Sequence, residues 1–128
     1  MAARRPARVL VTRNFEDNLA GLEAFLERAG AGDAFDRFLG DLIDRVVPLL
    51  ALDSARAERS GLGRPFPEQS YSSPELLFVL ERVRRRLQGR ELRQLVRGSF
   101  VVLYVEAART LYLVAVKHSR EREFRVGR

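Results

Sequence analysis

The stretch Glu91–Arg120, ELRQLVRGSFVVLYVEAARTLYLVAVKHSR, decides the fold of this chain. It contains three runs rich in β-branched and aromatic residues, which predict strands over Leu92 to Arg97, Phe100 to Glu106 and Thr110 to His118. The connections between these runs are only a few residues long, and the first of them is Gly98-Ser99. The stretch therefore predicts an antiparallel meander.

The register of the meander sorts its side chains onto two faces, because side chains alternate along a strand. If Arg97 pairs with Phe100 and Glu106 with Thr110, one face is aliphatic and should face the core: Leu92, Val96, Val101, Leu103, Val105, Leu111, Leu113 and Ala115. The other face should be the working surface: Arg93, Arg97, Phe100, Val102, Tyr104, Tyr112, Val114, Val116 and His118. Arg93, Tyr104 and Tyr112 then form one row across the sheet.

The upstream sequence predicts a strand and three helices. Residues 8 to 12 form the strand, and Asn14 caps a helix that ends at Gly30 and Gly32. Asp33 begins a second helix, which Pro48 should kink or end. After a loop between about Ser54 and Ser73, a third helix begins at Ser73-Pro74-Glu75, has a basic far side and stops at Gly89. The charged tail after Arg120 should fray.

These elements predict an α+β fold over a single domain, residues 1–128. The N-terminal strand, the helical hairpin and the third helix should pack on one face of the C-terminal antiparallel sheet. The chain has no cysteine, and no cluster of His, Asp or Glu has the spacing of metal ligands, so we expect neither a metal nor a cofactor.

The longest apolar run, Val46 to Leu52, is too short to cross a bilayer, and no signal peptide is evident. We therefore expect a cytoplasmic protein without a membrane partner.

The net charge of +6 is unevenly distributed. Residues 1–81 carry a balance of −3, whereas residues 82–128 carry +9. A basic pole suggests an acidic partner, either nucleic acid or an acidic protein segment. A solubilising arginine-rich surface is the plainer interpretation.

The order of elements resembles that of the RelE/ParE toxins of bacterial type II toxin–antitoxin modules. The likeness is carried by Leu92-Arg93, by Gly98 to Tyr104, and by Leu111 to Val116 followed by the basic tract Lys117-His118-Ser119-Arg120. Gly61-Leu62-Gly63-Arg64 is similar to the Gly-Arg loop of the family. The segment from Pro65 to Gly89 is longer than in the simplest members.

The resemblance implies a growth-inhibiting toxin that a cognate antitoxin neutralises in a hetero-oligomer. Two activities occur in the family: ribosome-dependent mRNA cleavage, and poisoning of DNA gyrase without nuclease chemistry. A third alternative is an inactive module that only binds the antitoxin.

Metal-independent cleavage of mRNA needs proton transfer and cations over the developing phosphate charge. The candidate catalytic residues are Arg97, His118 and Arg120, because His118 is the only histidine and should lie beside the Gly98-Ser99 turn. Candidate substrate-binding residues are the cations and one aromatic that could grip phosphate or stack on a base: Arg64, Arg93, Tyr104 and Lys117. Each of these residues could instead have a structural role, in packing or as surface charge.

Overall fold

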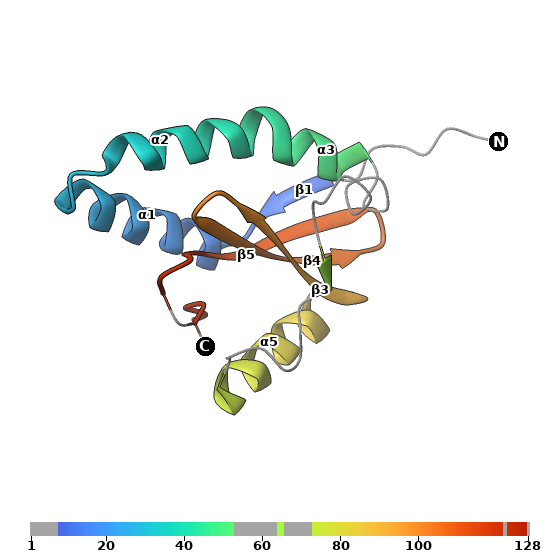
Figure 1. Ribbon diagram of the computed structural model, residues 1–128. Helices are drawn as coiled ribbons and strands as arrows, with labels where there is room; N and C mark the ends of the chain where they lie inside the picture. Colours follow the sequence, from blue (N-terminus) through green and yellow to red (C-terminus); the bar gives the residue numbers. More distant parts are fainter. Residues whose placement is uncertain (1–7, 53–63, 66–72, 122, 128) are drawn as a thin grey trace.

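The computed structural model describes residues 8–52, 64–65, 73–121 and 123–127 of the chain. One mixed sheet has the strand order β1-β5-β4-β3-β2, with the strands β1 Arg8–Val11, β2 Arg64–Pro65, β3 Glu91–Arg97, β4 Phe100–Ala107 and β5 Thr110–His118. The helical elements are α1 Arg13–Arg28, α2 Gly32–Asp41, the π-helical stretch η1 Leu42–Val46, α3 Val47–Leu52 and α5 Pro74–Arg86 (Figure 1). The α+β class is confirmed.

The C-terminal meander forms where the sequence predicts it. Strands β3 and β4 are antiparallel, with Arg97 opposite Phe100 as expected, and Gly98 takes a positive φ of 59° in the turn between them. Strand β1 pairs with β5 in parallel, so the sheet is mixed rather than purely antiparallel. The first strand of the chain is thus joined to the last.

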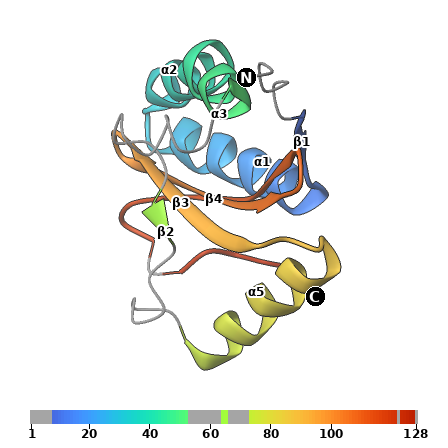
Figure 2. The same cartoon turned by 90° about the vertical axis from the view of Figure 1, so that its right-hand side faces the viewer.

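The helices cover both faces of the sheet, so the prediction that they pack on one face is wrong. Helices α1 and α2 lie on one side and α5 on the other (Figure 2). The first core lies under α1 and α2 and includes Leu95, Phe100, Val102 and Tyr104. The second lies under α5 and includes Leu80, Leu103 and Val105. The face expected to be an open working surface is therefore the floor of a core.

The register between β4 and β5 also differs from the expected one. Tyr104 lies opposite Leu113 and Leu103 opposite Ala115, which leaves Val114 as an extra residue in β5. Tyr112 consequently lies opposite Val105 and packs in the core under α5. The expected row of Arg93, Tyr104 and Tyr112 does not form, although Arg93 does lie opposite Tyr104.

The helical hairpin begins and continues differently from its predicted form. Thr12, not Asn14, caps α1, because its side-chain oxygen accepts a hydrogen bond from the Phe15 amide. Of the two outcomes expected at Pro48, a kink or an end, the end does not occur. The chain widens into the π-helical turn η1 just before Pro48 and continues as α3. A wider turn accommodates the carbonyl that the proline nitrogen cannot bond.

Helix α5 begins as predicted, with the Ser73 side chain accepting a hydrogen bond from the Leu76 amide and Pro74 at the first position. Its end packs closely on the sheet. A Cβ atom at Gly89 would lie 2.0 Å from Cγ1 of Val105, which is fully buried. Gly89 thus lets the end of the helix lie directly against β4.

The described part of the tail is anchored, so the prediction that it frays is wrong there. Phe124 is buried in the core under α5. The Asn14 side chain donates to the Val114 and Arg125 carbonyls and accepts from the Gly127 amide, 2.7 Å away. These bonds occupy Asn14, which explains why it does not cap the helix.

Candidate functional site at the end of the sheet

The candidate site lies where β3 turns into β4 and β5 ends. Arg97, Phe100 and His118 are paired in register and form one row across three strands. The Ser119 amide donates to the Ser99 carbonyl over 2.7 Å, so the end of β5 is held against the Gly98-Ser99 turn. The expected position of His118 beside this turn is confirmed.

Phe100 is the centre of the row and fixes the histidine. Its ring stacks on Phe38 of α2, with centroids 4.2 Å apart, and meets the His118 ring edge-on at 5.5 Å. Nδ1 of His118 accepts a hydrogen bond from the Arg120 amide over 3.2 Å. This hydrogen bond occupies Nδ1, so a ligand would meet the ring at Nε2.

Arg97 is held by an ion pair with Asp41 of α2. Its Nε donates to Oδ2 over 2.7 Å and its Nη2 to Oδ1 over 2.8 Å, a two-point grip. The hydrogen bonds from Arg97 hold the pKa of the Asp41 carboxyl below its ordinary value, against a smaller opposing effect of burial. The same ion pair raises the pKa of Arg97. The cation is thus largely neutralised within the protein.

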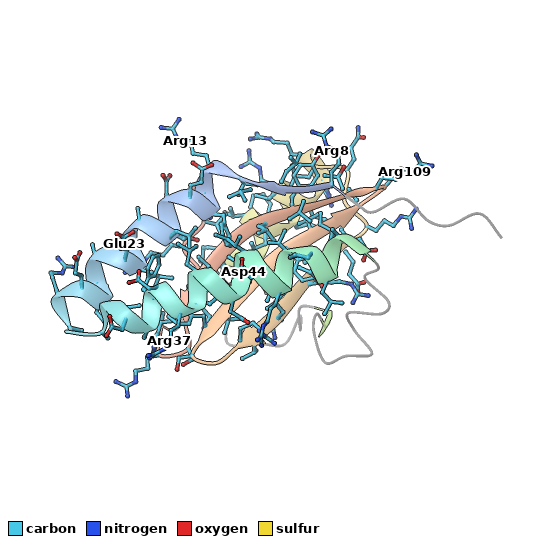
Figure 3. The ribbon with its side chains drawn as sticks, turned by 90° about the horizontal axis from the view of Figure 1, so that it is seen from above. Arg8, Arg13, Glu23, Arg37, Asp44 and Arg109 are labelled. Carbon is cyan, nitrogen blue, oxygen red and sulfur yellow. The ribbon has the colours of Figure 1, made fainter. Side chains whose placement is uncertain are left out.

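A groove of about 400 Å³ opens beside this ion pair. Its lining comes from α2 and from the β3–β4 turn: Ala34, Arg37, Phe38, Asp41, Val96, Arg97, Gly98, Ser99 and Phe100. Arg37 is exposed and extends into solvent at this end of the molecule, whereas Arg8 and Arg109 lie at the opposite end (Figure 3). We call this cavity the sheet-end groove.

The other basic residues of the C-terminal tract point to different surroundings. Arg120 is exposed, and its backbone amide donates to Nδ1 of His118. Lys117 donates to the Glu121 carbonyl over 2.9 Å and lies 5.5 Å from the centre of the Phe124 ring. It therefore lies toward the core under α5 and away from the His118 side of the strand.

Two of the remaining candidate residues, Tyr104 and Arg93, are not part of this site. Tyr104 is 0% exposed, so it cannot stack on a base. The Arg93 side chain is 13% exposed and forms ion pairs with Glu91 and Glu106. Arg64 lies in β2 opposite Gln94, and its side chain lies outside the described residues, as does the Gly61 to Gly63 part of the expected Gly-Arg loop.

The geometry brings His118 and Arg97 to the same end of the sheet but does not join them. They belong to strands on either side of β4, so their backbones are about 10 Å apart at ordinary strand spacing. The Phe100 ring lies between them in the row, and Asp41 engages the guanidinium. The described residues here provide cations and one titratable ring, without a paired acid and base.

Sequence reasoning missed the contribution of α2. Asp41 and Phe38 are three positions apart on the helix that covers the sheet, and both reach the row. The signal was present, since a three-residue spacing places two side chains on one helix face. Without the two-sided arrangement of helices, nothing indicated that this helix face meets Arg97.

Comparisons with protein-family models, with curated proteins and with solved structures found no match in any of the three. Within the described ranges, no helix is long and apolar enough to cross a membrane. Among the same residues, no group of three or more His, Cys, Asp or Glu side chains is arranged to hold a metal ion.

The Asp41–Arg97 ion pair predicts an acid-sensitive contribution to stability. The pKa of Asp41 is lower in the folded chain than in the unfolded one, so its contribution is complete above the unfolded pKa, about 3.9. It is lost as the pH falls through the lower folded pKa. Because both side chains are partly exposed, we expect about 1 kcal/mol.

Urea unfolding of the wild type and of Asp41→Asn at pH 7 and at pH 2.5 measures this contribution. The difference in unfolding free energy should be present at pH 7 and should shrink at pH 2.5. An unchanged difference would contradict the ion-pair explanation.

Proposed function

We propose that this protein is a toxin-like component of a type II toxin–antitoxin module that inhibits growth by binding a macromolecule. A cognate antitoxin would neutralise it. The target would be an acidic or nucleic-acid-associated complex, as with DNA gyrase for the ParE-like members of the family that the sequence resembles. Its working surface would be the sheet-end groove with Arg37 at its rim.

The support for a toxin-like protein is the order of its elements. A strand, a helical hairpin and a three-stranded meander ending in Lys117-His118-Ser119-Arg120 occur in the order that carries the resemblance to RelE/ParE toxins. The end of the last strand lies against the Gly98-Ser99 turn, so the two most family-like segments are neighbours. The long segment before Gly89 contributes α5, which covers the second face of the sheet.

The single observation that favours binding over RNA cleavage is the two-point ion pair between Asp41 and Arg97. A cation that must stabilise a phosphorane has to offer its donors to the phosphate. Here the Asp41 carboxylate already accepts hydrogen bonds from the Arg97 guanidinium. Tyr104 is buried and cannot assist. Arg37 is not among the ion pairs within the described residues, and its exposed side chain can meet an acidic partner.

Induced expression in a bacterial host without an antitoxin tests this proposal. We expect growth arrest with intact transcripts, and Arg37→Glu should relieve the arrest because it reverses the charge at the rim of the groove. Arg13→Glu is the matched control, since Arg13 is exposed on α1 away from the groove, and it should remain toxic.

Two outcomes would contradict the proposal. Cleavage inside translated messages would establish the nuclease activity instead. Normal growth with soluble, folded protein would leave an inactive antitoxin-binding module as the remaining interpretation.

Ribosome-dependent mRNA cleavage is the second candidate, and the row of Arg97, Phe100 and His118 favours it. On the ribosome, a phosphate would have to displace Asp41 from Arg97 while Nε2 of His118 transferred a proton. This mechanism requires Arg97→Ala, His118→Ala and Arg120→Ala to abolish toxicity. Retained arrest in the His118→Ala variant would exclude it.

A further inference from the structure

Helix α5 lies on the opposite face of the sheet from α1 and α2 (Figure 2). Its outer side carries a second groove, of about 550 Å³. Its lining combines apolar side chains with two arginines: Pro74, Glu75, Phe78, Val79, Arg82, Val83, Arg86 and Gly127. Phe78 is 65% exposed, more than any other large apolar side chain in the described ranges. We call this cavity the α5 groove.

The α5 groove lies mainly on the exposed side of α5, and Val83 at its edge also packs against the core under the helix. Leu76 and Leu80 are buried toward the sheet. Four lining residues follow three- and four-residue spacing and so form a stripe along the outer side: Glu75, Phe78, Arg82 and Arg86. From Glu75 to Arg86 this stripe is about 16 Å long, which matches three turns of a partner helix.

The charges of the α5 groove indicate a partner with acidic side chains. Arg82 and Arg86 lie on its C-terminal half, and within the described part of the chain neither forms an ion pair with a carboxylate. The Arg82 guanidinium lies 6.0 Å from the centre of the Phe78 ring, so the cation is held over the apolar floor. The neighbouring Arg84 is different, because it binds Glu81 and the Gly89 carbonyl.

We propose that the α5 groove binds an amphipathic, acidic helix of a partner protein. Apolar side chains at positions i, i+4 and i+7 of that helix would cover Phe78, Val79 and Val83. Its Asp or Glu side chains would face Arg82 and Arg86, and Glu75 at the other end of the groove would disfavour acidic residues there. This site does not include any residue of the sheet-end groove, and the proposal does not depend on toxicity.

The test uses the purified full chain and a fluorescein-labelled synthetic helix of about 16 residues, with leucines at the three positions and glutamates flanking them. We expect saturable binding by fluorescence anisotropy that weakens as salt is raised. The same peptide with lysine in place of glutamate should bind at least tenfold more weakly. Amide NMR shifts should map to residues 75–86 of α5.

Matched variants assign the binding to the α5 groove. Phe78→Ser and the double change Arg82→Glu with Arg86→Glu should each weaken binding about tenfold without altering the circular dichroism spectrum. Phe25→Ser, at a Phe that is 53% exposed on α1, and Arg13→Glu should leave it unchanged.

Three results would overturn the proposal. These are equal binding of both peptides, tighter binding of a labelled RNA or DNA oligonucleotide that the same variants abolish, and self-association of the chain that Phe78→Ser abolishes.

Discussion

Phe100→Ala should lower the free energy of unfolding by about 3–5 kcal/mol. The ring is 5% exposed and stacks on Phe38, while the His118 ring meets its edge. Truncation leaves a cavity between α2 and the sheet and removes both aromatic contacts. Since small domains are stable by only about 5–15 kcal/mol, this change removes a large share of the total.

Chemical denaturation followed by circular dichroism measures the effect of Phe100→Ala. Phe25→Ala is the matched control, because that ring is 53% exposed and its removal should cost less than about 1 kcal/mol. Equal losses in the two variants would show that Phe100 does not hold α2 to the sheet. The histidine ring of Phe100→Ala should also show altered NMR shifts, since its packing surface is gone.

Gly89→Ala should lower the free energy of unfolding by about 2–3 kcal/mol, although it adds only one methyl group. The new Cβ would lie 2.0 Å from Cγ1 of Val105, so either the buried valine or the end of α5 has to move. Gly21→Ala is the informative control. No atom lies within 4 Å of a Cβ at Gly21, and alanine is the better helix former by about 1 kcal/mol.

Thermal unfolding of both glycine variants checks the prediction that the two substitutions change stability in opposite directions. The midpoint should fall for Gly89→Ala and rise for Gly21→Ala. A rise in both would mean that the contact between α5 and β4 yields without cost. The binding of the acidic peptide to the α5 groove should also weaken in Gly89→Ala if the helix has shifted.

Local sequence signals predicted the elements of this fold well, because each depends on near neighbours. The three strands of the meander, the turn at Gly98 and the start of α5 at Ser73-Pro74 were all predicted from short-range chemistry. Asn14 shows where such reasoning fails. Asparagine is a good helix cap by residue type, yet the Asn14 side chain instead donates a hydrogen bond to the Val114 carbonyl, 100 residues away.

The arrangement of the faces could not be predicted from alternation alone. Every residue of β5 from Leu113 to Val116 is buried, since helices cover both sides of the sheet. A strand buried on both faces reads as a continuous apolar run, so its register is not marked by polar residues. The extra residue at Val114 places Tyr112 on the other face of the sheet, and nothing in the apolar pattern indicated this shift. The Asp41 partner of Arg97 depended on that same tertiary arrangement.

The parallel pairing of β1 with β5 bears on how the chain folds during synthesis. Strand β1 finds its hydrogen-bonding partner only after the residues that follow Thr110 have left the ribosome. The hydrogen bond from the Gly127 amide to the Asn14 side chain joins residues 113 positions apart, so it also forms only after the C-terminal segment is synthesised. Contacts between residues so distant in sequence form late and slow the folding of the chain. The helical hairpin is synthesised well before β5, on which α1 packs, so until then its apolar face is uncovered and is a surface that a chaperone can recognise.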